Sequence, residues 1–196
     1  MKMLIIILST LLSLSLFAND DNNVSADAGK RAGFFVGLSA GFAYQNMNFL
    51  SNSKSEREDL YSGASSSFKA GLFLDEHFAI FYSNYTTFFS APYKNANSYT
   101  DKIYLDTLSG IGVSYFFTEN KSYFISGSVG SAIFNTLGKN NLNFGSAYLL
   151  SFGYELDNNI NIELVVKKAS KYNSREYDFL SVDAQSTQIL VGYTFY

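Results

Sequence analysis

Cysteine and tryptophan are absent from this 196-residue chain, and it has one proline and one histidine. Without cysteine the chain forms no disulfide, no thiolate metal site and no cysteine nucleophile. The single histidine, His77, excludes metal sites built from several histidines. We therefore expect no bound metal and no cofactor.

Charge is scarce as well. Charged residues make up 16% of the chain, against roughly 25% in an average soluble protein. The 14 basic and 17 acidic residues give a net charge of −3, and no basic run is present, which excludes a strongly basic nucleic-acid-binding protein. The chain has instead 19 Phe and 15 Tyr. So aromatic a chain can offset its ordering entropy, which excludes intrinsic disorder.

The N-terminus indicates export. The apolar run 4–18 is too short for a spanning helix, which needs about 20 residues, and it fits the apolar region of a secretory signal. Cleavage after Ala18 is our prediction, although the tripeptide 26–28 matches the small-x-small rule better. The expected organisation is a signal peptide at 1–18, a flexible periplasmic leader at 19–32 and one barrel domain at 33–196.

Period-2 alternation of apolar with small or polar residues begins at Gly33 and continues to the C-terminus. This pattern is typical of strands with one face against an apolar environment. Seven segments alternate clearly, while residues 78–89 are strand-like by composition only, so we assign them no faces. The eight expected strands are 34–45, 63–74, 78–89, 102–116, 123–134, 144–156, 160–168 and 185–196.

The connections between these strands alternate in length. Short turns are expected at 75–77, 118–122 and 157–159, and longer polar loops at 46–62, 90–101, 135–143 and 169–184. In an up-and-down meander all short turns then lie at one end, as in outer-membrane barrels with short periplasmic turns and longer extracellular loops. The sequence therefore predicts an all-β fold, an eight-stranded antiparallel up-and-down transmembrane β-barrel with both termini in the periplasm.

The facing of the strands favours a membrane barrel over a soluble one. One face is large and aromatic, and the other carries Gly, Ser and Ala with few charges. A soluble sandwich or lipocalin inverts this arrangement, whereas in lipid the sheet must close to pair every backbone group. We expect the apolar faces outward; a soluble secreted all-β protein is the alternative.

The C-terminal strand 189–196 alternates apolar residues and ends in aromatic ones, a feature shared with a known family of barrels. The chain resembles the eight-stranded outer-membrane barrels of OmpA and OmpX type over about 33–196. That resemblance implies a bacterial outer-membrane location, contact with lipid and lipopolysaccharide, and a last strand read by the barrel-insertion machinery. Tyr196 lies one residue beyond the usual end, so either it is the terminal signal or the register is shifted by one. The implied insertion signal is Ile189, Val191, Tyr193, Phe195 and Tyr196.

Five charged residues fall on the small-residue face of the strands: Lys69, Asp106, Glu155, Glu163 and Lys167. An eight-stranded barrel is just wide enough to be filled by side chains, and charges inside it have to pair. We therefore expect a polar network that plugs the lumen. A gated path for protons or ions is the alternative.

His77 raises the question of an enzyme. It falls in a short turn at the periplasmic end, without the serine two residues on that lipid A deacylase barrels show, so we expect no enzyme. The segments 53–59 and 167–178 mix charges of both signs. They are expected to be solvated and to contact lipopolysaccharide phosphates, or else to recognise a host, matrix or phage ligand.

The predicted function is structural: an integral outer-membrane barrel, monomeric, with a plugged lumen and with extracellular loops available for surface recognition or adhesion. A narrow, porin-like conduit for small or hydrophobic solutes is the alternative. A lipid-modifying barrel enzyme is less favoured, because the sequence shows no polar triad for the extracellular rim.

Overall fold

The computed structural model describes residues 33–51, 57–95, 98–117, 123–137, 143–156, 159–170 and 179–196. The signal peptide predicted at 1–18 and the leader predicted at 19–32 lie outside these ranges. Within them, no helix is long and apolar enough to cross a membrane.

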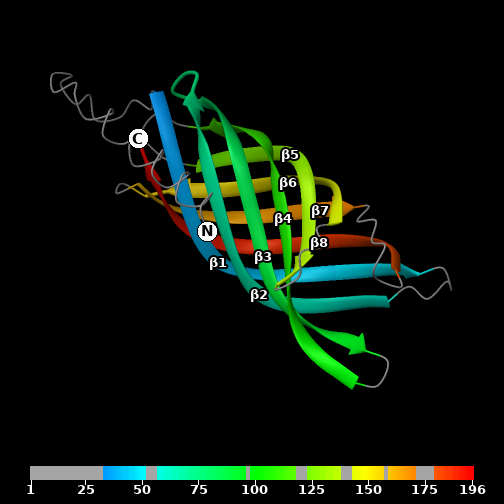
Figure 1. The fold of residues 1–196 in the computed structure, drawn as a ribbon. Helices are drawn as coiled ribbons and strands as arrows, with labels where there is room; N and C mark the ends of the chain where they lie inside the picture. Colours follow the sequence, from blue (N-terminus) through cyan, green and yellow to red (C-terminus); the bar gives the residue numbers. More distant parts are fainter. Residues whose placement is uncertain are drawn as a thin grey trace, which may run out of the picture. The chain divides into compact units, whose positions relative to one another are not determined.

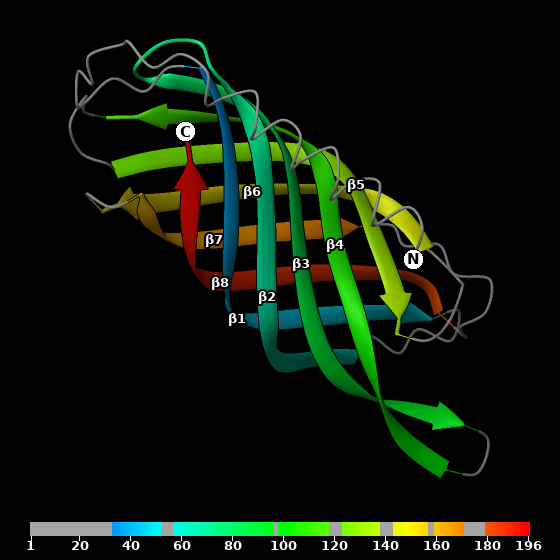
Figure 2. The same ribbon diagram turned by 60° about the vertical axis from the view of Figure 1, so that its left-hand side comes forward.

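Eight strands form one closed antiparallel barrel in the order of the chain, with β1 paired to β8 (Figures 1 and 2). This arrangement confirms the predicted eight-stranded up-and-down barrel. The strands are β1 (Gly33–Ser51), β2 (Arg57–Phe73), β3 (Phe78–Asn95), β4 (Ser98–Phe116), β5 (Tyr123–Thr136), β6 (Asn143–Glu155), β7 (Ile160–Ser170) and β8 (Phe179–Phe195).

The two ends of the barrel are named here by their connections. The turn end carries the links β2–β3, β4–β5 and β6–β7, together with the start of β1 and the end of β8. The loop end carries the links β1–β2, β3–β4, β5–β6 and β7–β8. At the turn end, Asn159 has φ 61°, a left-handed conformation that Asn tolerates better than most residues. The Leu156 amide donates to the carbonyl of Ile160 at 2.7 Å, which closes this turn.

The strands extend further toward the loop end than the sequence predicts. Much of the loops predicted at 46–62 and 90–101 is paired strand. Beyond the closed belt, β3 and β4 continue as a two-stranded ribbon in which Ser90 pairs with Ile103 and Asn95 with Ser98 (Figures 1 and 2). The regular alternation ends earlier than the pairing because the residue types there mix polar and apolar without a period of two, while the backbone groups still bond across the hairpin.

Burial alternates along the strands as the barrel requires, except in β3, where Tyr85, Thr86 and Thr87 are buried in succession. The outward residues are exposed, with Phe42 at 78% and Ile111 at 71%, and they belong to the predicted apolar faces. In β3, whose faces the sequence leaves open, Phe81, Tyr85 and Phe89 are buried and therefore point inward.

Glycine permits close strand approach at one cross-strand pair. Gly110 of β4 lies opposite Gly130 of β5. A Cβ on Gly110 would lie 2.1 Å from the carbonyl oxygen of Val129, and one on Gly130 would lie 2.2 Å from that of Ser109. Only residues without a Cβ fit this part of the wall.

The interior is layered along the barrel axis. An aromatic cluster fills the turn end: Phe35, Phe73, Ala79, Phe81, Phe116 and Phe124. A larger apolar cluster that includes Met47, Phe89, Tyr104 and Phe134 fills the loop-end half. Buried charged and polar side chains lie along the same lumen, so the sheet encloses a packed core.

Candidate functional site

A fully enclosed ion pair joins β4 and β7. The Lys167 ammonium lies 3.0 Å from Asp106 Oδ2, and both side chains are 0% exposed. Lys167 Nζ also donates to the Asp106 carbonyl oxygen at 2.7 Å, and Gln45 Nε2 donates to Asp106 Oδ2 at 2.9 Å. These bonds compensate the two charges for the loss of water.

A second ion pair lies closer to the turn end. Lys69 Nζ is 2.8 Å from Glu163 Oε1, and the two side chains are 13% and 1% exposed. The same carboxylate oxygen accepts hydrogen bonds from Tyr85 (3.0 Å) and Ser151 (2.5 Å). The ammonium also lies 5.3–5.6 Å from the ring centroids of Phe81, Tyr85 and Phe124, within range of cation–π attraction.

Glu155 lies at the turn-end mouth, where it borders the same small cavity as Lys69. Its Oε2 accepts a hydrogen bond from the Tyr196 hydroxyl at 2.7 Å. The five charged residues expected in one network therefore all face the lumen, but they are arranged as two separate pairs and one carboxylate at the mouth.

Several uncharged partners in the lumen were not singled out from the sequence. Gln188 Nε2 donates to Thr87 Oγ1 (3.2 Å) and Ser186 Oγ (3.0 Å), and the Ser65 hydroxyl donates to Gln188 Oε1 (2.5 Å). Gln188 and Ser65 already stood on the predicted inward faces, so a search for all polar inward residues would have found them. Tyr85 and Thr87 could not be predicted to face the lumen, because the sequence leaves the faces of residues 78–89 unassigned.

Aromatic side chains pack against one another inside the barrel toward the loop end. Tyr61, Phe89, Tyr104 and Phe134 come from four successive strands, and neighbouring rings stack with centroids 5.5–5.7 Å apart. At the turn end, Lys69, Glu155 and Tyr196 border a cavity of ≈ 30 Å³. This is about the share of one water molecule in the liquid, so the described lumen has little free space there.

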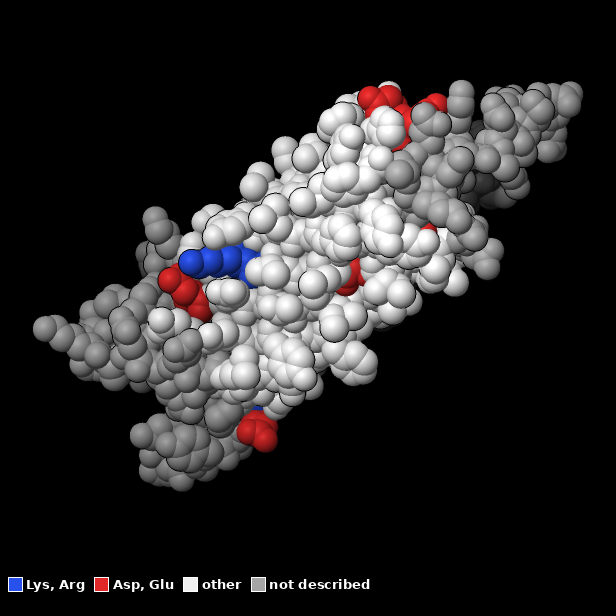
Figure 3. Space-filling view, turned by 180° about the vertical axis from the view of Figure 1, so that it is seen from behind, with Lys and Arg blue, Asp and Glu red and all other residues white. Residues whose placement is uncertain are grey.

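The outside of the barrel is an apolar belt. Large hydrophobic side chains are exposed on all eight strands, among them Leu38, Leu150 and Val191 at 51–61%. Figure 3 shows the described part of one side as largely uncharged, with Lys, Arg, Asp and Glu in isolated patches. Soluble monomers rarely expose large contiguous apolar patches, so this surface is unlike theirs.

The residues of the implied insertion signal do not all lie on the same face of the barrel wall. Ile189, Val191, Tyr193 and Phe195 are 41–58% exposed on the outer face. Tyr196 lies on the other side, with its ring 5.7 Å from that of Phe73 and its hydroxyl bonded to Glu155. Phe195 thus ends the outward row; which residue the insertion machinery reads stays a prediction.

His77 is bound into the turn between β2 and β3. Its Nδ1 lies 2.8 Å from the Phe116 carbonyl oxygen. Asp75 Oδ1 accepts hydrogen bonds from the amides of His77 and Phe78, both at 2.7 Å. These bonds hold the pKa of the exposed Asp75 carboxyl below its usual value, because they favour the charged form.

In the part of the chain that the structure describes, no group of three or more His, Asp or Glu side chains is placed to hold a metal ion. The charge-rich segments 53–59 and 167–178 lie mostly outside the side chains described. Lys167 and Lys168 are exceptions, because both belong to β7.

The closed eight-stranded meander with an outward apolar belt is the architecture of small outer-membrane barrels, and solved structures share the fold. The attachment invasion locus protein Ail of Yersinia pestis, crystallised with the heparin analogue sucrose octasulfate, has a TM-score of 0.55 at 12% identity, covering 83% of this chain and 99% of that one. OprG from Pseudomonas aeruginosa gives 0.52 at 12% identity, covering 86% and 98%. Neisserial surface protein A gives 0.50 at 14% identity, covering 83% and 96%. No family model matches the chain, and no curated protein sequence matches it.

Proposed function

We propose that the chain is an integral protein of the bacterial outer membrane, with its turn end in the periplasm and its loop end outside the cell. The observation that carries this proposal is the set of outward apolar side chains on all eight strands, around a sheet with no open edge. In lipid this combination satisfies every backbone group internally and places the apolar side chains in hydrocarbon. In water the same belt would expose a large aggregation-prone surface.

Fractionation and gel mobility test the membrane placement. The protein should be recovered in the outer-membrane fraction after export and signal cleavage, and it should migrate differently in SDS with and without boiling, because closed barrels resist SDS until heated. A soluble periplasmic protein with one mobility would overturn the proposal.

The lumen is proposed to be closed. Two buried ion pairs, the stacked aromatic side chains toward the loop end and the cavity of ≈ 30 Å³ at the turn end support a plug over a conduit. We expect purified protein in planar bilayers to show no steady conductance. Stepwise conductance, or uptake of a small or hydrophobic solute by vesicles, would favour the conduit instead.

Surface recognition or adhesion is the proposed role of the loop end. Connections held on a rigid scaffold commonly carry binding, and the segments 53–59 and 167–178 contain Lys and Arg. Because Ail was crystallised with a heparin analogue, sulfated glycans are the first ligands to test. Cells carrying the protein should adhere to immobilised heparin more than cells carrying K54A/R57A; equal adhesion would exclude this segment as the contact.

No enzymatic role is proposed. The histidine on which such a role would depend has its Nδ1 against a backbone carbonyl oxygen at the turn end. Incubating the purified barrel with labelled lipid A tests this point, and release of an acyl chain would contradict it.

A further inference from the structure

The two halves of the outer belt differ in chemistry. On β7, β8 and β1 the outward positions are apolar through the belt, from Ile160 to Val166, from Phe195 to Ile189 and from Phe34 to Tyr44. On β2–β6 a polar row crosses the belt. The outward members of this row, matched by strand register, are Ser66, Thr86 and Thr107 on one line and Asn84, Ser109, Ser131 and Ser146 on the next.

The polar row lies within the belt, because apolar outward residues flank it on both sides. On β4, Ile111 and Val113 follow toward the turn end, and Leu105 and Ile103 follow toward the loop end. Hydroxyl and amide groups facing hydrocarbon have no water to bond with, so they need partners in the protein.

Most of the row finds such partners. Tyr82 and Ser109 share a hydrogen bond of 2.6 Å, and Thr86 and Thr107 share one of 3.0 Å. Asn84 takes part through one atom, with its Oδ1 3.2 Å from Thr86 Oγ1. Whichever way the amide is turned, its other polar atom has no hydrogen-bond partner among the residues that the structure describes.

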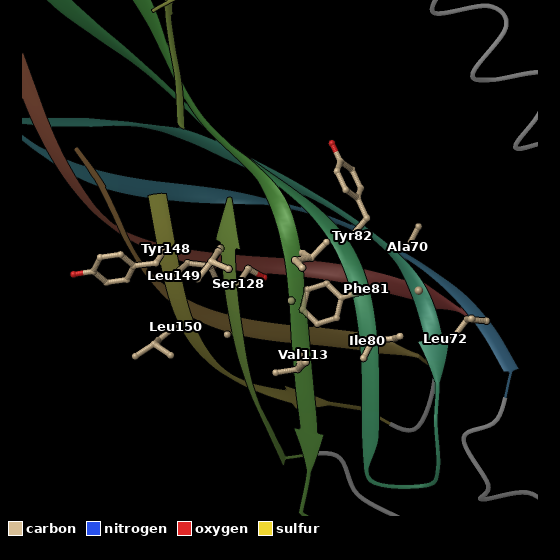
Figure 4. Close-up of a pocket in the computed structure, with 15 residues that line it drawn as sticks. Ala70, Leu72, Ile80, Phe81, Tyr82, Val113, Ser128, Tyr148, Leu149 and Leu150 are labelled. Atoms are coloured by element: carbon tan, nitrogen blue, oxygen red, sulfur yellow. The ribbon is translucent and has the colours of Figure 1, made fainter. Parts of the chain in front are cut away.

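A groove of ≈ 900 Å³ adjoins the row toward the turn end. It crosses the outside of β2–β6, and Figure 4 shows Tyr82 on β3 and Tyr148 on β6 projecting on different sides of it. Its lining includes the outward positions Ala70 and Gly127, whose small size lowers the surface between the larger neighbours. Small and hydrogen-bonding side chains together are typical of protein–protein contacts inside membranes.

We propose that this face docks a second copy of the chain in the membrane, with Asn84 near a two-fold axis. An amide carries both donors and an acceptor, so two Asn84 side chains related by a two-fold axis bond to each other reciprocally. A two-fold interface uses the same patch on both copies, and two copies inserted in the same direction meet in this way. A lipid chain offers neither donor nor acceptor at this depth.

This inference rests on the proposed membrane placement, and it is an alternative to the monomer expected from the sequence. The chain has no cysteine, so each single substitution introduces a unique thiol. Ser109 is the outward cross-strand neighbour of Asn84, so S109C keeps the amide in place. S109C should form a linked dimer when native outer membranes are treated with a short bis-maleimide. I162C, an outward position on β7, is the matched control and should form about tenfold less.

A second test fills the groove with a larger side chain. A Cβ on Gly127 would lie 3.6 Å from Leu150 Cδ2, an ordinary contact, so Gly127→Leu fits the barrel while occupying the groove. In the S109C background it should lower the dimer yield about tenfold, whereas Ala40→Leu, outward on β1, should leave the yield unchanged. Heat-dependent mobility of every variant shows that the barrel is folded.

The outcomes separate the two proposals. If no heat-modifiable band appears in the outer-membrane fraction, the proposed function fails. If the band is present but S109C links no more than I162C, lipid covers this face and the dimer alone is overturned. If S109C links well but Gly127→Leu has no effect, the contact excludes the groove and the proposed interface is also overturned.

Discussion

The two ion pairs of the lumen have the same chemistry in different surroundings. Lys167 and Asp106 are wholly enclosed, and Lys69 and Glu163 lie beside the turn-end cavity, with Lys69 13% exposed. The bonds of Asp106 include those from Lys167 and Gln45. One oxygen of Glu163 accepts three donors, and its Oε2 has no hydrogen-bond partner among the described residues. Because a buried charge is stabilised only by its partners, loss of a partner should matter more in the enclosed pair.

The largest effect is expected from Asp106→Asn. This change keeps the shape of the side chain but leaves the Lys167 ammonium buried without its carboxylate, which should lower the free energy of unfolding by ~3–5 kcal/mol. Urea titration of the barrel in vesicles, followed by unboiled gel mobility, measures the loss. The double variant D106L/K167M serves as control and should recover most of the stability, since apolar pairs replace buried ion pairs well. If the double variant is as unstable as the single one, packing and not charge accounts for the loss.

Glu163→Gln is the matched change in the other pair, and its effect should be smaller. Lys69 keeps three aromatic rings around it and borders the cavity, so water can solvate the ammonium in part. The expected loss is ~1.5–3 kcal/mol, the range for hydrogen bonds to charged groups. The same urea titration measures it. If Glu163→Gln lowers the free energy of unfolding as much as Asp106→Asn or more, the two ion pairs do not differ in the proposed way.

Sequence alternation predicts which residues face the lumen, but it does not predict which of them meet. The inward and outward faces of seven strands were predicted correctly, because hydrocarbon outside favours large apolar residues and the crowded lumen inside favours small or polar ones. The segment 78–89 resisted assignment because Phe81 and Tyr85 inside are as apolar as Ile80 and Tyr82 outside. Lys69 and Glu163 are 94 positions apart, and only the stagger of the closed sheet brings them together.

Tyr196→Phe examines the wettest carboxylate of the lumen, Glu155. The change removes the 2.7 Å hydrogen bond from the tyrosine hydroxyl and keeps the ring against Phe73. Because Glu155 lies at the mouth, the expected loss is ~0.5–1.5 kcal/mol, that of an ordinary hydrogen bond. Thermal unfolding in vesicles measures it, with Tyr193→Phe on the outer face as control. A larger loss than for Glu163→Gln would reverse the order proposed along the lumen.

The smallest effect is expected outside the lumen, at Asp75, and it should depend on pH. The folded state holds the pKa of this carboxyl below its ordinary value of 3.8, chiefly through the His77 and Phe78 amides. A carboxyl with a lowered pKa stabilises the fold above its unfolded pKa, and that contribution is lost as pH falls through the lowered value. The amides of His77 and Phe78 should therefore exchange faster, relative to their intrinsic rates, below about pH 4. Asp75→Asn keeps an acceptor without a titratable group, so its amide protection should not change over that range. The same acid-induced loss in Asp75→Asn would mean that another group in the turn titrates.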